Sequence, residues 1–201
     1  MRRIDIVNRN TSAFAVWITG LPASGKTTIA NELARQLREL QTEIAVLESD
    51  SLRKVFSAKP AYDEQDREYF YGALAFIGRV LTEHGIAVVF DATANRRSYR
   101  DRARQQIARF LEVLVDCPLE VCIRRDPKGI YRKAREGKAS HVPGVQTPYE
   151  PPANPDLVIR GDQDDPNKAA RRIIDLLSKK NFLHILGGLH GFNGFSSAES
   201  V

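Results

Sequence analysis

The sequence predicts one α/β domain in which a parallel sheet is covered by helices on both faces. Strand and helix signals alternate along the chain, as they do when successive parallel strands are joined by crossover helices. The length of 201 residues suits a single domain of this kind and is enough to bury a core. The predicted strands are the apolar runs at residues 14–19, 44–47, 86–90, 111–115 and 156–160.

Helices are predicted between these strands from apolar residues at helical spacing. The first helix carries its apolar face on Ile29, Leu33, Leu37 and Leu40. The others are a helix from about residue 63 to 84, an arginine-rich helix at 96–109, and a closing helix with its apolar face at 169–177.

Residues 126–155 are rich in charge, proline and glycine and form no predicted helix or strand. A loop of this length in a compact domain usually serves as a lid or a binding segment, so we expect a lid here. The remaining organisation is an N-terminal extension at 1–13, one domain at 14–180, and a glycine-rich tail at 181–201 that we expect to be flexible.

Composition limits the possible partners. The net charge of +5 comes mainly from two basic stretches, 96–104 and 124–138. A small phosphate-rich substrate explains these charges better than a polynucleotide does, because no RNA-binding aromatic pattern is interleaved with them. With no run long enough to span a membrane and no secretion signal, we expect a cytoplasmic protein without a membrane partner. Cys117 and Cys122 are too few for a disulfide framework and are expected in the core.

The clearest functional motif is a phosphate-binding loop between the first strand and the first helix. Residues 20–27 match the pattern G-x-x-x-x-G-K-[ST], in which backbone N–H groups and a helix N-terminus surround a triphosphate. We expect Lys26 to reach the β- and γ-phosphates and to be catalytic, and the Thr27 hydroxyl to bind Mg²⁺. The expected ATP-binding residues are Gly20, Leu21, Pro22, Ala23, Ser24, Gly25, Lys26, Thr27, Thr28 and Arg125.

Two aspartates follow predicted strands and are expected beside this loop, because the carboxyl ends of parallel strands meet at one edge of the sheet. Asp50 would face the transferred phosphate, either as the base for an acceptor hydroxyl or as a holder of Mg²⁺ waters. Asp91 would orient Mg²⁺ through water. Each could instead cap the helix or turn that follows it, and for Asp50 the two roles are compatible.

Phosphoryl transfer also needs positive charge near the equatorial oxygens and the exclusion of water. Arg124, Arg125, Lys128 and Lys133 lie on the predicted lid and its hinge, so closure of the lid would supply both. The alternative is that these residues form only a solvated helix face.

Longer motifs resemble those of the adenylylsulfate kinases, which use MgATP to phosphorylate the 3′-hydroxyl of adenosine 5′-phosphosulfate. The resemblance covers roughly residues 14–180. It is carried by the phosphate loop, by ESDSLR at 48–53 in place of D-G-D-x-x-R, by YDEQDR at 62–67, by VDCPLEVC at 115–122, by RDPKGIYRKAR at 125–135, and by the G-I-x-x-P-Y-E match at 144–150.

The resemblance implies a P-loop kinase sandwich of three layers, with a five-stranded parallel sheet in the order 2-3-1-4-5 and a lid. It implies Asp50 as the catalytic carboxylate, ATP and Mg²⁺ as cofactors, and a homodimer. It also implies a substrate site in which Arg53 and Arg67 hold the phosphosulfate, Tyr62 stacks on the adenine, and Lys128 contacts substrate or phosphates.

Two positions and one segment depart from the family pattern. Val142 replaces the second adenine-stacking aromatic residue, Phe70 replaces an asparagine, and residues 90–97 replace the F-I-S-P segment. The last run, which places Thr93 at the substrate, resembles other P-loop small-molecule and polynucleotide kinases. A kinase for another nucleotide-linked or small-molecule hydroxyl therefore stays open. A nucleotide-binding regulatory protein is the third reading, although the N-K-x-D motif of GTPases is missing.

Overall fold

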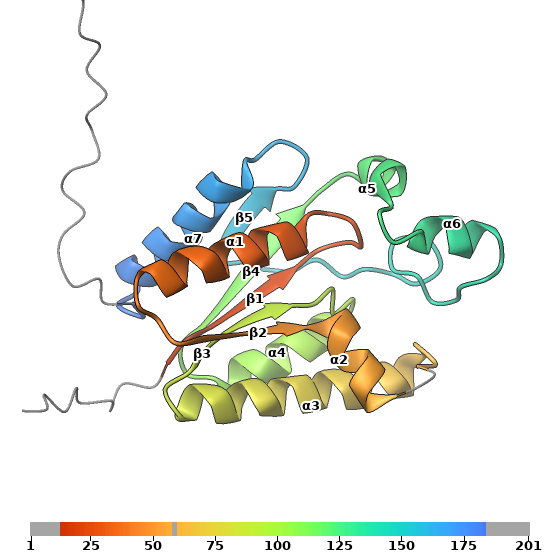
Figure 1. Cartoon of the computed structure of the whole chain (residues 1–201). Helices are drawn as coiled ribbons and strands as arrows, with labels where there is room; N and C mark the ends of the chain where they lie inside the picture. The colour runs from red at the N-terminus through yellow and green to blue at the C-terminus, as the bar shows by residue number, and fades with distance from the viewer. Residues whose placement is uncertain (1–12, 58–59, 184–201) are drawn as a thin grey trace, which may run out of the picture.

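The computed structural model describes residues 13–57 and 60–183 as a three-layer sandwich of helices around one parallel sheet (Figure 1). The strands are β1 Ala15–Thr19, β2 Ile44–Glu48, β3 Ala87–Asp91, β4 Phe110–Asp116 and β5 Leu157–Arg160. The helices are α1 Lys26–Glu39, α2 Ser49–Phe56, α3 Glu64–Glu83, α4 Arg97–Gln106, α5 Leu119–Arg125, α6 Ile130–Arg135 and α7 Pro166–Lys179.

The sheet has the order β2-β3-β1-β4-β5, and every pair in it is parallel. The predicted fold class and strand order are therefore confirmed. The two central strands, β1 and β3, are buried along their whole length, because helices cover both faces. The phosphate loop and the carboxyl ends of β2 and β3 consequently meet at one edge of the sheet.

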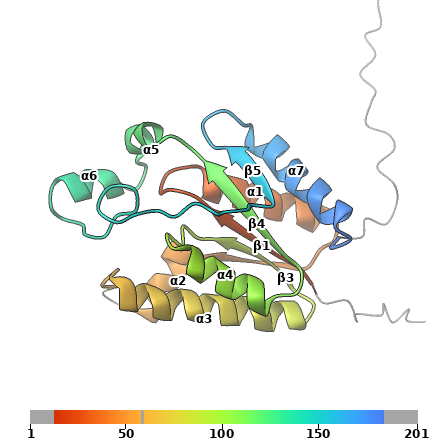
Figure 2. The same ribbon diagram turned by 180° about the vertical axis from the view of Figure 1, so that it is seen from behind.

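Two apolar cores lie on the two faces of the sheet. Helices α1 and α7 cover one face, with Leu33, Leu37 and Ile173 packed on β1 and β4. Helices α3 and α4 cover the opposite face, where Trp17 stacks on Phe90 with ring centroids 4.5 Å apart. Figure 2 shows the same two layers from behind, with α5 and α6 extending beyond the carboxyl ends of the strands.

The structure corrects three details of the sequence prediction. The arginine-rich helix ends at Gln106 rather than at residue 109, because the Arg109 carbonyl already accepts a hydrogen bond from Ala15 at the edge of β1. The stretch 126–155 is not all loop, since α6 forms within it and buries Tyr131 and Ala134. Helix α2 was not predicted as an element, although it follows β2 directly.

The chain ends differ in how much of them is described. Phe182 and Leu183, near the start of the predicted tail at 181–201, pack against the core beside α7. Residues 1–12 of the predicted extension and 184–201 of the tail lie outside the described residues. Within the described residues, no helix is long and apolar enough to cross a membrane.

Candidate active site

The phosphate loop has the backbone shape that its sequence predicts. Gly20 has φ of 150°, and a Cβ added there would lie 2.5 Å from the Val115 carbonyl oxygen. Gly25, with φ of 106°, precedes the first residue of α1 in a left-handed conformation. Only glycine fits both positions without strain, so these two residues allow the loop to close tightly.

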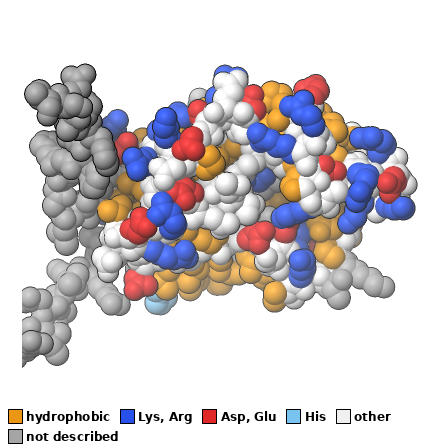
Figure 3. All heavy atoms as spheres, turned by 45° about the horizontal axis from the view of Figure 1, so that its top comes forward, with side chains coloured by type: hydrophobic (Ala, Val, Ile, Leu, Met, Phe, Trp, Pro, Cys, Tyr) orange, Lys and Arg blue, Asp and Glu red, His pale blue; other side chains and the backbone are white. Residues whose placement is uncertain are grey.

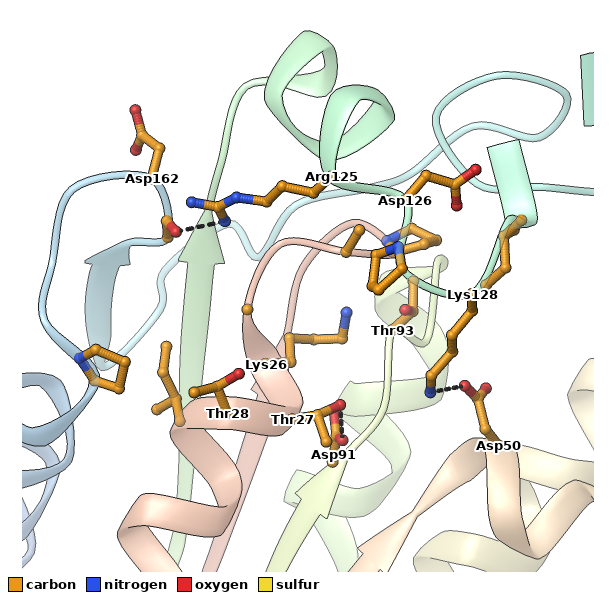
Figure 4. A pocket seen from close by; sticks show the side chains of 18 of the residues that line it. Lys26, Thr27, Thr28, Asp50, Asp91, Thr93, Arg125, Asp126, Lys128 and Asp162 are labelled. Carbon is orange, nitrogen blue, oxygen red and sulfur yellow. Dashed lines mark hydrogen bonds and ion pairs between the residues drawn. The ribbon is translucent and has the colours of Figure 1, made fainter. Parts of the chain in front are cut away.

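Lys26 is the first residue of α1, and its side chain reaches back to this loop. Its Nζ donates a hydrogen bond to the Leu21 carbonyl at 2.8 Å, and only 7% of the residue is exposed. Burial lowers the pKa of Lys26, while the nearby carboxylates of Asp91 and Asp50 oppose that shift. The Lys26 side chain lines a cleft, with Thr27 and Asp91 beside it (Figure 4).

Thr27 and Asp91 form a hydrogen-bonded pair beside the lysine. The Thr27 hydroxyl donates to Asp91 Oδ2 at 2.6 Å, and Asp91 is 4% exposed at the end of β3. Burial raises the pKa of Asp91, while Lys26 and the Thr27 hydrogen bond act against this. Helix α4 has Arg96 as its N-cap residue, so Asp91 does not cap it. Hydroxyl and carboxylate oxygens suit Mg²⁺.

Residues 13–57 and 60–183 contain no group of three or more His, Cys, Asp or Glu side chains arranged to hold a metal. Mg²⁺ at Thr27 and Asp91 would therefore need further oxygens from phosphate groups or water. That requirement matches the way Mg²⁺ is held in nucleotide sites, where it keeps several waters and substrate phosphates.

A cleft of about 690 Å³ opens above the loop and takes in most of the predicted ATP-binding residues. It is lined by Pro22, Ala23, Gly25, Lys26, Thr27, Thr28 and Arg125, together with Asp91 and Lys128. The remaining predicted residues Gly20, Leu21 and Ser24 do not line it. Gly20 packs against β4, and the buried Ser24 side chain lies near Gly20 rather than in the cleft.

We call this first cleft the donor cleft, because it contains the phosphate loop. One of its walls is formed by a segment that the sequence did not predict as part of the site. Residues 161–166 follow β5 and line the cleft, and the Gly161 carbonyl accepts a hydrogen bond from Arg125 at 2.8 Å. The signal was available, because the segment lies at the carboxyl end of the fifth strand, where ligands collect in open parallel sheets.

A second cleft of about 530 Å³ adjoins the first. Its lining includes six of the predicted substrate residues, namely Asp50, Arg53, Tyr62, Arg67, Thr93 and Val142. The two clefts share Pro22, Ser49, Asp50, Thr93 and Ile130. We call the second cleft the acceptor cleft. Asp50 and Thr93 line both the donor cleft and the acceptor cleft and thus lie where the two meet.

Asp50 is the second residue of α2 and is exposed to the clefts. Its Oδ2 accepts a hydrogen bond from Lys128 Nζ at 2.6 Å, and the same ammonium lies 3.5 Å from Glu48 Oε1 (Figure 4). Since Glu48 is the N-cap residue of α2, Asp50 is not the cap. Lys128 lines the donor cleft and not the acceptor cleft. Glu48 is a site residue that the sequence analysis did not single out.

Arg67 ties three separate segments together at the acceptor cleft. Its guanidinium donates to the Tyr62 carbonyl at 2.8 Å, to Asn95 Oδ1 at 2.8 Å and to the His141 carbonyl at 2.7 Å. Burial lowers the pKa of Arg67. The arginine therefore joins the start of α3, the segment after β3, and the lid.

The predicted lid has its own small apolar core. Val142 is 4% exposed and packs in a cluster with Cys117, Cys122, Tyr131 and Ala134. Both cysteines are free and buried, as expected. Tyr62, by contrast, is 39% exposed at the mouth of the acceptor cleft.

Positive charge gathers on the outside of this lid. Figure 3 shows blue side chains crowded over the end of the molecule that α5 and α6 occupy. The exposed basic residues there are Arg124, Arg125, Lys128, Arg132, Lys133, Arg135 and Lys138. Arg125 and Lys128 face the donor cleft, and Lys133 and Lys138 face the acceptor cleft, so both clefts lie under cationic side chains.

Comparison with known proteins gives one consistent result. The family model for adenylylsulphate kinase matches residues 12–160. An adenylyl-sulfate kinase of Halothermothrix orenii is 37% identical over 177 residues, covering 88% of this chain and 96% of that protein. One from Synechococcus sp. (strain JA-3-3Ab) is 38% identical over 168 residues, covering 84% of this chain and 96% of the relative.

A solved structure is similar throughout the same region. The Mycobacterium tuberculosis APS kinase CysC, determined in complex with AMPPNP and APS, superposes with a TM-score of 0.79 at 36% identity. The match covers 83% of this chain and 98% of the solved chain. By the family model, the sequence relatives and the solved structure together, this chain belongs to the adenylylsulphate kinase family.

Proposed function

We propose that the protein transfers the γ-phosphoryl group of ATP to the 3′-hydroxyl of adenylylsulfate, giving 3′-phosphoadenylylsulfate and ADP. The observation that carries the proposal is the meeting of two clefts at Asp50 and Thr93, one of them floored by the phosphate loop. A related kinase has been solved with AMPPNP and APS together, which supports a donor and an acceptor nucleotide side by side.

In the donor cleft, the loop N–H groups and Lys26 would hold the β- and γ-phosphates, and Arg125 would border the nucleotide from the lid. The Thr27 hydroxyl and the Asp91 carboxylate would hold Mg²⁺, the carboxylate through water. When bound, Mg²⁺ neutralises charge that develops on the transferred phosphoryl group. The Thr27 and Asp91 oxygens, with phosphate groups and water, would together supply the oxygen ligands that Mg²⁺ prefers.

In the acceptor cleft, Asp50 would accept the proton of the attacking hydroxyl, since its carboxylate stands at the junction of the clefts. Lys128 pairs with that carboxylate in the structure, so we expect it to move toward the phosphates when the substrates enter. Residues 126–155 would then act as the lid that excludes water.

Recognition of the acceptor would come from Tyr62, Arg53 and Thr93, with Arg67 holding the surrounding segments in place. The adenine would be stacked on one side only, because Val142 lies in the lid core. This one-sided stacking supports the alternative function, in which the acceptor is a different nucleotide-linked or small-molecule hydroxyl. A nucleotide-binding regulatory protein is less well supported, since a second cleft adjoins the nucleotide cleft.

An acceptor panel with purified protein and MgATP tests the proposal. We expect ADP formation with adenylylsulfate, and none above background with shikimate, gluconate or a 5′-hydroxyl oligonucleotide. Asp50→Asn should retain ADP binding and lose turnover, whereas Asp162→Asn, at the far wall of the donor cleft, should retain turnover. Turnover with another acceptor in place of adenylylsulfate would decide for the alternative.

We further propose, from the family assignment, that the enzyme works as a homodimer in the cytoplasm. Sedimentation equilibrium tests the first statement, and a single species at the mass of one chain would contradict it.

A further inference from the structure

Arg53 is a buried arginine with one nitrogen left unpaired. It lies on α2, is 4% exposed, and lines the acceptor cleft. Its NH1 donates to Asp66 Oδ2 at 2.9 Å, whereas its buried NH2 has no hydrogen-bond partner in the described part of the chain. A buried, unpaired guanidinium nitrogen is costly unless a ligand satisfies it.

Three aromatic rings surround this guanidinium. The Arg53 Cζ atom lies 3.9 Å from the ring centroid of Phe70, 5.0 Å from that of Tyr62 and 5.3 Å from that of Tyr71. Phe70 is the closest, is 2% exposed, and is itself fixed by an edge contact with Tyr71 at 5.2 Å. A ring face attracts the cation without taking any of its N–H donors.

Phe70 is also one of the positions at which this chain departs from the family pattern. An amide side chain there could accept a hydrogen bond from the guanidinium, whereas a phenyl ring cannot. With NH1 held by Asp66 and the face held by Phe70, the NH2 group of Arg53 stays available to an anion in the acceptor cleft.

We propose that Phe70 is a positioning residue, which stacks under Arg53 and presents the unpaired NH2 edge to the anionic group of the acceptor. The inference rests on the proposed function and concerns how the same cleft selects an acceptor that bears a phosphate or sulfate group. Guanidinium pairs well with such oxyanions only when its plane is fixed, because its donors form a rigid fork.

The test measures KM for both substrates in Phe70→Leu, which keeps an apolar side chain but removes the ring face. We expect KM for adenylylsulfate to rise about 5- to 30-fold, with KM for ATP within twofold of wild type. Phe110→Leu is the matched control. Phe110 is buried in the same core, also lies under an arginine with Arg104 Cζ 5.1 Å from its ring, and is at the opposite end of the sheet from the clefts.

A double-mutant cycle with Arg53→Lys separates positioning from packing. If Phe70 acts through Arg53, the lysine substitution should raise KM for adenylylsulfate much less in the Phe70→Leu background than in the wild type. A general loss of core packing would move stability and both KM values in Phe70→Leu and in Phe110→Leu alike.

The outcomes distinguish this inference from the function on which it rests. Wild-type turnover with adenylylsulfate, combined with an unchanged KM in folded Phe70→Leu or with additive effects in the cycle, would overturn the inference alone. Absence of wild-type turnover with adenylylsulfate would overturn the proposed function and this inference with it.

Discussion

Gly161 sets how closely the segment after β5 approaches the phosphate loop. A Cβ added at Gly161 would lie 2.2 Å from the Ser24 carbonyl oxygen and 2.8 Å from Val115 Cγ1. The first neighbour is backbone of the phosphate loop and the second is a buried strand residue, so neither can turn aside as a flexible side chain would. In Gly161→Ala the phosphate loop must shift by roughly 1 Å to restore van der Waals contact.

The size of the effect follows from the cost of overpacking, about 1–3 kcal/mol. If the loop stays in place, the protein loses that free energy of unfolding, which lowers Tm by about 2–12 °C in a chain of this size. If the loop moves away, nucleotide binding must restore it, which weakens ADP binding by about 5- to 140-fold. The two losses should together account for the overpacking cost.

Thermal unfolding and calorimetric titration with Mg·ADP measure both quantities on one preparation. Gly72→Ala is the control, because a Cβ there meets only Arg102 NH1 at 2.9 Å, at the end of a partly exposed side chain. Gly161→Ala with wild-type Tm and wild-type ADP affinity would refute the claim that this contact shapes the nucleotide site.

Three further predictions concern Gly78, Glu32 and Asp91. Gly78→Ala should lower the free energy of unfolding by about 2 kcal/mol, because the added Cβ would lie 2.2 Å from Phe90 Cζ. This cost outweighs the better helix propensity of alanine. Denaturation monitored by tryptophan fluorescence measures the change, and a more stable variant would contradict the prediction. The pKa of Glu32 is lowered to about 2 by its hydrogen bonds from Arg35 and Gln36, so its stabilising effect is present above pH 4.5 and is lost as pH falls toward 2. Glu32→Gln should therefore lower Tm at pH 7 but not at pH 2, and equal differences at both would count against it. Burial raises the pKa of folded-state Asp91 above its usual value of 3.8, so stability falls as pH rises from 3.8 to that raised pKa, and Asp91→Asn should gain Tm relative to wild type at pH 7 but not below pH 3.8.

Several parts of the site could be predicted from the sequence because each depends on local geometry. The phosphate loop needs glycine where φ is positive, a lysine, and a hydroxyl residue at the start of a helix, all within eight consecutive positions. Asp50 and Asp91 could be placed beside it because parallel strands bring their carboxyl ends to one edge. The pairing of Thr27 with Asp91 then completes what that rule predicts.

Other parts depend on which side chains meet across the sheet, and no local pattern encodes that. Lys128 and Asp50 form a pair although they are 78 positions apart in the sequence. Lys128 lines the donor cleft because of the path that the chain takes after α5. Arg67 was predicted as a substrate ligand, yet in the structure it donates hydrogen bonds to Tyr62, Asn95 and His141 of the protein itself. Its role in substrate binding stays a prediction.

By itself, the sequence determined the α/β class, the strand order through its family motifs, and the site of phosphate binding, since these follow from hydrophobic periodicity and from residues close along the chain. Only the tertiary structure decided that Gly161 lies against the phosphate loop, that Phe70 lies under Arg53, and that α6 forms within residues 126–155. The physical reason is that packing acts between surfaces brought together by folding, where an ångström of approach decides whether a contact stabilises or clashes.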